Sequence, residues 1–315
     1  MSGLKYKGGR YPISLTYDGG LSEEHFISLY DLSKALIGFE RSLALTTHFV
    51  LNGGEVITQV PYLRGARIIC SPPEVGSFKV PAYIVSTAMF FGAVGTLEQN
   101  NPIGHMIYSL YDLVIHEATG QKVDYNKSLR EIYEDGLEQG TEGLVIPRQS
   151  QVESLVEKIE PSISDLHRPI VKSETAKTLV IDNEASEETE ENQRGGSPIL
   201  LNRMTYEQLR YRDRGDEIIP LIGKVSSFNM NTFNGRFLTE ADARPIPFFL
   251  TPAGRSSKGV RRIGESLSHN IIDPNSNRSL IQFDVQKTVT RTGRTAKLSV
   301  VKVREAPDDD QLIER

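Results

Sequence analysis

The chain has 315 residues, 38% of them hydrophobic, which is enough for a sizeable core divided between two or three domains. Its formal net charge of −5 taken alone argues against a nucleic-acid partner, because phosphate binding depends on Lys and Arg. Cys70 is the only cysteine, which excludes an intramolecular disulfide and favours a reducing, cytoplasmic compartment. The N-terminus shows no secretion-signal pattern. The most apolar run, residues 84–97, is shorter than the roughly 20 residues that span a bilayer, so we predict a buried helix there and no membrane partner.

Residues 11–20 predict a first strand, because apolar and polar residues alternate before a glycine turn. Ser22 is suited to cap a helix that follows, with acidic residues in its first turn. This amphipathic helix is expected to end near residues 52–54. Its apolar stripe consists of Phe26, Leu29, Leu32, Leu36, Phe39 and Leu43.

Three β-rich runs follow, which predict a meander packed on the long helix. They cover residues 54–63, 65–71 and 76–85. Pro81 indicates that its strand lies at a sheet edge, since proline cannot donate a backbone hydrogen bond. The next helical patterns cover residues 102–120 and 125–140, and another begins at Ser150.

Residues 182–198 are acidic and almost free of apolar side chains, so we predict a solvated linker between an α+β domain, residues 1–181, and a second domain, residues 199–306. The second domain begins with a short helix around 204–212 and continues with five short strands. A helix over 257–271 interrupts the strands. This pattern predicts a small closed β-barrel of OB or SH3-like type, followed by a frayed tail, residues 307–315.

The charges are distributed unevenly along the chain. Residues 203–304 hold 18 Lys and Arg against 9 Asp and Glu, a formal +9, while the rest of the chain carries −14. A basic barrel with interleaved aromatic residues is typical of single-strand binders, in which cations follow the backbone and rings stack on bases. The expected ring contacts are Phe228, Phe233 and Phe237. The expected phosphate contacts are Lys224, Arg236, Arg244, Arg255, Lys258, Arg261, Arg262, Lys287, Arg291, Arg294 and Lys297.

The same composition also fits other interpretations. Phe248, Phe249 and Phe283 stand beside Ile or Leu and are expected in the core. The basic surface could instead dock on the acidic first domain, on another copy of the chain or on another protein. In residues 223–233, period-two alternation places Lys224 and Phe228 on one face and Val225 on the other, and leaves open which face meets solvent.

Enzyme signals are weak. No P-loop, nucleophile elbow or zincin motif is present, and we predict no metal or cofactor site. On a helix, His105 and His116 would lie roughly 16 Å apart, too far to share one metal. Cys70 lies in an apolar run without a neighbouring base, which argues against a nucleophile. An unfamiliar catalytic site at the domain junction remains a third hypothesis, after nucleic-acid binding and self-assembly.

The stretches YDGGLSEEHFISLYDLSKALIGFERSLALTTHFVLNGG and SPPEVGSFKVP resemble the N-terminal part of uncharacterised bacterial proteins that share a domain of unknown function. The resemblance covers the first third of the chain and supplies no catalytic residues. It implies a bacterial cytoplasmic protein of a kind that serves in phage defence or on mobile elements. From the basic barrel, and not from the resemblance, the expected function is that of a non-catalytic binding or adaptor protein whose barrel engages nucleic acid.

Overall fold

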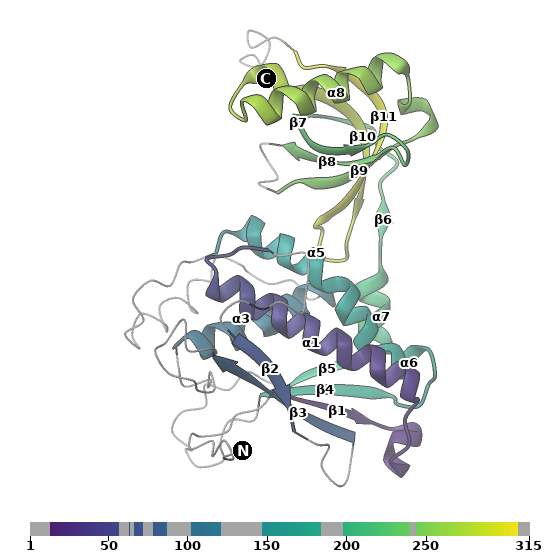
Figure 1. The fold of residues 1–315 in the computed structure, drawn as a ribbon. Helices are drawn as coiled ribbons and strands as arrows, with labels where there is room; N and C mark the ends of the chain where they lie inside the picture. The colour runs from purple at the N-terminus through teal and green to yellow at the C-terminus, as the bar shows by residue number, and fades with distance from the viewer. Residues whose placement is uncertain are drawn as a thin grey trace. The chain divides into compact units, whose positions relative to one another are not determined.

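The computed structural model describes residues 13–56, 63, 66–71, 78–86, 102–120, 147–183, 198–239 and 244–307. The chain forms two compact units, residues 1–210 and 211–315. The first unit combines helices with an antiparallel sheet and the second is a closed five-stranded β-barrel with one long helix, which confirms the predicted α+β class (Figure 1).

The first unit is built on a five-stranded sheet in the order β2-β3-β1-β4-β5, in which every neighbouring pair is antiparallel. The side chains that alternate along the predicted first strand, Ile13, Leu15 and Tyr17, are fully buried. The strands are β1 (Ile13–Asp18), β2 (Ala66–Cys70), β3 (Phe78–Ser86), β4 (Thr178–Asn183) and β5 (Ile199–Asn202).

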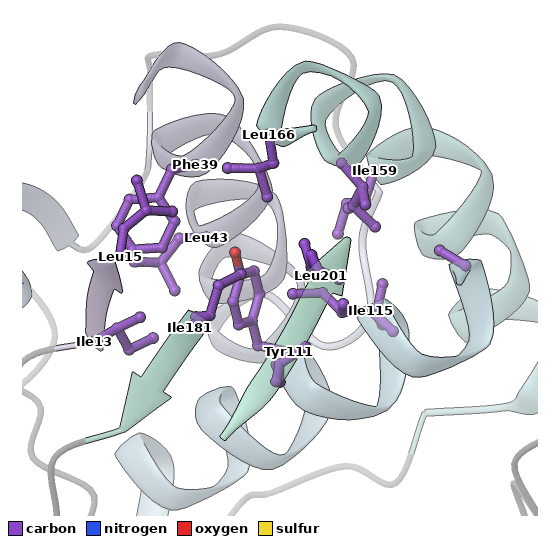
Figure 2. Packing of buried hydrophobic residues seen from close by; sticks show 14 of the residues in the cluster. Ile13, Leu15, Phe39, Leu43, Tyr111, Ile115, Ile159, Leu166, Ile181 and Leu201 are labelled. Carbon is purple, nitrogen blue, oxygen red and sulfur yellow. The ribbon is translucent and has the colours of Figure 1, made fainter. Parts of the chain in front are cut away.

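Helices pack on the face of this sheet that carries Ile13, Leu15 and Tyr17 of β1, and the core lies between the helices and the sheet (Figure 2). Gly38 of α1 lets α1 and α5 approach closely, because a Cβ there would lie 2.6 Å from the carbonyl oxygen of Ser162. The Tyr111 hydroxyl lies 2.9 Å from Ser42 Oγ inside the core. The helical elements are η1 (Gly20–Glu24), α1 (Leu29–Leu51), α3 (Pro102–Ala118), α5 (Gln149–Leu166), α6 (Arg168–Val171) and α7 (Arg203–Arg210).

The long helix begins later than predicted. His25 adopts a left-handed backbone conformation, φ 64°, which separates the 3-10 turn η1 from α1. Ser28 therefore caps α1 and accepts a hydrogen bond from the backbone N–H of Asp31, while the Ser22 hydroxyl donates to Gly19 O. The predicted apolar stripe buries Leu32, Phe39 and Leu43, with Leu36 partly buried, but Phe26 and Leu29 are exposed.

The prediction of an edge strand at Pro81 is wrong, because β3 pairs with β2 on one side and β1 on the other. The Pro81 carbonyl accepts a hydrogen bond from the backbone N–H of Ser71. The backbone nitrogen and carbonyl of one strand residue point to the same side, so the Pro81 nitrogen, which has no hydrogen to donate, also faces β2. The last pair between β2 and β3 is Cys70 opposite Ala82, so the neighbouring residue of β3, Pro81, lies just beyond the paired region. An interior strand therefore tolerates the proline where its neighbour ends.

Residues 84–86, where a buried helix was expected, belong to strand β3. Three expected segments lie wholly or partly outside the described residues: the rest of that apolar run, the β-rich run 54–63 except for residues 54–56 and Leu63, and the helical pattern at 125–140. Within the part of the chain that the structure describes, no helix is long and apolar enough to cross a membrane.

The second unit closes its barrel in the order β7-β8-β9-β11-β10, with β10 pairing back onto β7 and the short β6 extending beside β10. Counted along the chain, the third and fifth barrel strands are β9 and β11, and they pair in parallel. In the sequence, the long helix α8 comes between the third strand, β9, and the fourth, β10. This is the Greek-key arrangement of an OB-type barrel. The elements are β6 (Asp213–Arg214), β7 (Ile219–Asn229), β8 (Asn234–Thr239), β9 (Ile246–Leu250), η2 (Pro252–Gly254), α8 (Ser257–Ile272), η3 (Asn277–Ser279), β10 (Ile281–Val289) and β11 (Thr295–Glu305).

Aromatic rings fill the barrel. Phe237 and Phe283 stack with their ring centroids 4.2 Å apart, and Phe248 meets Phe283 edge-on at 5.1 Å. Helix α8 closes the barrel with Ile263, and the side chains of Val260 and Leu267 pack beside it.

The units divide at Arg210 and Tyr211 rather than at the expected linker. Strand β5 pairs with β4 in the first sheet, and Leu201 and Leu209 are buried in the first core. The predicted short helix, α7, therefore belongs to the first unit. Of the acidic segment, residues 184–197 lie outside the described residues and connect two neighbouring strands of that sheet.

Candidate nucleic-acid interface

Two of the expected phosphate contacts are buried. The Arg244 side chain is 3% exposed and donates from Nη2 to the carbonyl oxygen of Thr295 at 2.5 Å. Arg294 is 8% exposed. Both guanidinium groups therefore belong to the barrel structure and not to an open surface.

Other cations are neutralised by carboxylates of the same unit. On α8, Arg261 Nε lies 2.8 Å from Glu265 Oε1, and Arg262 pairs with Glu305 at the end of β11. The Arg262 hydrogen bond and charge hold the pKa of Glu305 below its ordinary value, with a smaller contribution from the charge of Lys258. The basic surface predicted for α8 is thus largely compensated.

A third group of cations lies over aromatic rings. Lys297 Nζ is 4.3 Å from the ring centroid of Phe249, and the guanidinium carbon of Arg255 is 4.5 Å from that of Phe233. The guanidinium carbon of Arg291 lies 5.3 Å from the ring centroid of Tyr211. Among the residues that the structure describes, none of these three exposed cations has a carboxylate partner.

The strand register arranges these groups on the outside of the barrel. Arg236 pairs with Pro247, and the parallel register of β9 and β11 places Lys297 on the other side of Pro247. Two residues after Pro247 on β9, and on the same face, Phe249 pairs with Asn234 of β8. We call Asn234, Arg236, Pro247, Phe249 and Lys297 the outer β8–β9–β11 face.

Two hairpin loops of the barrel hold further candidate groups. Phe233 lies in the β7–β8 loop and its carbonyl accepts from Leu250 N–H, directly after Phe249. Arg291 lies in the β10–β11 loop, which precedes Lys297 on β11. The cations that lie over aromatic rings are therefore found on β11, in the β10–β11 loop and in the segment between η2 and α8.

The remaining expected contacts have local partners or lie on other strands. Lys224 Nζ donates to the carbonyl oxygen of Pro274 at 2.7 Å, and Arg236 Nη1 donates to that of Pro245 at 3.0 Å. Lys258 is exposed on α8, and Lys287 is half-buried on β10.

The expected roles of the rings change in part. Phe237 is fully buried in the core, and Phe228 is half-buried and stacks parallel to Phe248 at 6.0 Å. Phe249, expected in the core, lies on the outer face. The alternation in IPFFL could have revealed this, because Ile246, Phe248 and Leu250 are buried and the residues between them are not.

A β-bulge explains why alternation failed in β7. The register with β8 shifts between Val225 and Ser227, so that Val225 and Phe228 both point into the barrel. Tyr211 was not predicted as a ring contact because it was expected inside a helix, and only its contact with Arg291 marks it as a candidate.

The enzyme signals acquire local explanations. His116 Nδ1 lies 3.2 Å from Asp112 Oδ1, and this hydrogen bond raises the pKa of His116. The His105 side chain lies outside what the structure describes. Cys70 is exposed at the end of β2 rather than buried. Across the described ranges, no three His, Cys, Asp or Glu side chains are grouped as metal ligands would be.

Comparison with known families follows the division into units. No curated protein and no solved structure matches the chain. Residues 217–304, which include the barrel, match a family of unknown function, DUF7947. Residues 13–205, which cover most of the first unit, match a domain of unknown function, DUF7946, and the chain therefore belongs to the DUF7946 family.

Proposed function

We propose that the second unit binds single-stranded nucleic acid on the outer β8–β9–β11 face, as the binding module of a non-catalytic adaptor. The observation that carries this proposal is that Lys297 on this face, and Arg255 and Arg291 in loops of the same barrel, are exposed cations that lie over rings without a carboxylate partner in the described residues. Cations that follow a backbone and rings that stack on bases are the two components of single-strand sites.

The position of these groups supports the same function. OB-type barrels bind oligonucleotides on the face of their second and third strands and on the loops that join strands one and two and strands four and five. Here these elements are β8, β9, the β7–β8 loop and the β10–β11 loop. Because a fold does not by itself imply a function, the proposal depends on the side chains at this face.

Fluorescence anisotropy of a labelled single-stranded oligonucleotide with the full chain tests the proposal. We expect binding at low salt that weakens as salt rises, with a log–log slope of about −2 to −3 if three or four phosphates are contacted. Phe249→Ala should weaken binding about 5- to 150-fold, the effect of losing one stacked base. Lys297→Ala should weaken it and flatten the salt slope.

Arg261→Ala is the matched control, because it removes one positive charge that Glu265 already compensates. We expect it to bind as the wild-type chain does. Absence of binding to single-stranded and duplex DNA and RNA at low salt would refute the proposal. Salt-sensitive self-association, measured by light scattering, would instead support docking between copies of the chain.

A further inference from the structure

The β7–β8 loop holds an aromatic ring in an uncommon conformation. Phe233 has φ 53°, in the left-handed region that favours glycine or asparagine. The Asn229 side chain stabilises the preceding turn by accepting from the N–H groups of Asn231 and Thr232. The ring is partly buried against the barrel core, and its left-handed backbone beside an exposed arginine is a reason to look for a function beyond packing.

Leu250 ties the ring and the Arg255 guanidinium to the end of β9. Its N–H donates to Phe233 O at 3.0 Å, and its carbonyl accepts from Arg255 Nε at 3.1 Å. The guanidinium carbon then lies 4.5 Å from the Phe233 ring centroid. The backbone N–H and carbonyl of Leu250 thus bond to Phe233 and Arg255 respectively, which fixes the two residues next to each other.

Arg255 is exposed, so a ligand can reach its side chain. The cations on α8 are different, because Arg261 and Arg262 have carboxylate partners. A planar guanidinium stacks on the face of an unpaired base, which a lysine ammonium cannot do.

We infer that the Phe233–Arg255 pair is a stacking platform for one unpaired nucleobase, next to the Phe249 ring on β9. The inference rests on the proposed function and adds the chemical group that the loop recognises. Bases inside a duplex are stacked on one another and do not present a free face to this platform. The platform therefore selects single strands, through the plane of the guanidinium more than through its charge.

Arg255→Lys tests the inference in the full chain, because it keeps the positive charge and removes the planar guanidinium group. We expect Arg255→Lys and Arg255→Ala to weaken single-strand binding to a similar extent, about 5- to 30-fold, in an anisotropy titration. Arg261→Lys is the matched control, since it makes the same change at an exposed arginine of α8 that pairs with Glu265, and it should bind as the wild type does. Affinity for the duplex of the same sequence should not change with Arg255→Lys.

A set of short single strands, each with one abasic site, provides a second readout. At one position, removal of the base should weaken binding of the wild type but not of Arg255→Lys, since the two changes remove the same contact. Melting followed by circular dichroism should show that the variants fold normally.

If the wild type binds single strands and Arg255→Lys binds equally well, Arg255 is a phosphate contact or a bystander, and the inference is overturned while the proposed function stands. If no abasic position distinguishes the two chains, the inference is also overturned. If the wild type binds no nucleic acid, both proposals fail together.

Discussion

At the scale of single residues, burial decides which polar side chains belong to the structure. His167 is fully buried between α5 and α7. Its Nδ1–H donates to Ile163 O at 2.7 Å, and its Nε2 lies 2.9 Å from Thr205 Oγ1, which can donate to the neutral ring. Desolvation lowers the pKa of His167 to about 4, against a smaller opposing contribution from the Ile163 hydrogen bond.

This shift makes the stability of the first unit depend on pH. Unfolded His167 binds a proton near pH 6.5 and the folded ring only near pH 4, so the stability present above 6.5 falls by about 3 kcal/mol as the pH drops to 4. Calorimetry of the full chain at several pH values measures this loss. His167→Gln should remove that part of the dependence.

His116→Gln is the control, because the pKa of His116 is raised. Its stabilising contribution is complete below pH 6.5 and is lost as the pH rises through the raised pKa. This replacement should therefore lower stability by a constant amount below pH 6.5, remove the slope that His116 causes above pH 6.5, and leave the slope between 4 and 6.5 in place. An unchanged slope in His167→Gln would contradict the assignment.

At the scale of elements, close backbone approaches shape the barrel. A Cβ on Gly235 would lie 2.3 Å from Ser227 O and 2.6 Å from the Phe248 ring, where β8 meets β7 inside the barrel. Gly264, on the exposed side of α8, would meet nothing within 4 Å. The same chemical change therefore has opposite expected effects at the two positions.

We expect Gly235→Ala to destabilise the barrel by about 1 to 3 kcal/mol through overpacking. Gly264→Ala should stabilise α8 by about 1 kcal/mol, because alanine loses less backbone entropy in a helix. Calorimetric melting of the second unit measures both, with shifts of about 4–8 °C for each kcal/mol. Two shifts of the same sign would contradict the packing at Gly235.

At the scale of the whole molecule, the division into units determines which fragments fold. Ile199, Leu201 and Leu209 are buried with the first core although they follow the acidic segment. Each buried aliphatic side chain contributes about 1.5 to 3 kcal/mol, and three of them are comparable to the net stability of a domain.

We therefore expect fragments 1–210 and 211–315 to fold separately, with a cooperative melting transition each. A fragment that ends at residue 198 lacks β5 and α7 and should melt far lower or not fold. Circular dichroism and calorimetry of the three fragments make the comparison. A cooperative 1–198 fragment as stable as 1–210 would show that β5 and α7 are dispensable.

The charge pattern identifies the barrel region as the basic part of the chain, but not which of its cations are open to solvent. Composition counts Arg244, Arg262 and Lys297 as equal cations. In the fold, Arg244 is buried, Arg262 is paired with Glu305, and Lys297 lies over Phe249. Which of them is buried, paired or open to solvent depends on neighbours far away in the sequence, so no local pattern could distinguish them.

The sequence by itself determined the elements whose signals are local. Alternation in β1, the helical periodicity of α3, α5 and α8, and the turn residues between the barrel strands all act within a few positions. Tertiary structure alone decided the partners: β5 pairs with β4 across the acidic segment, the bulge turns Phe228 inward, and β3 becomes an interior strand. These outcomes depend on strand pairing between distant residues, whose free energy appears only when both strands are in place.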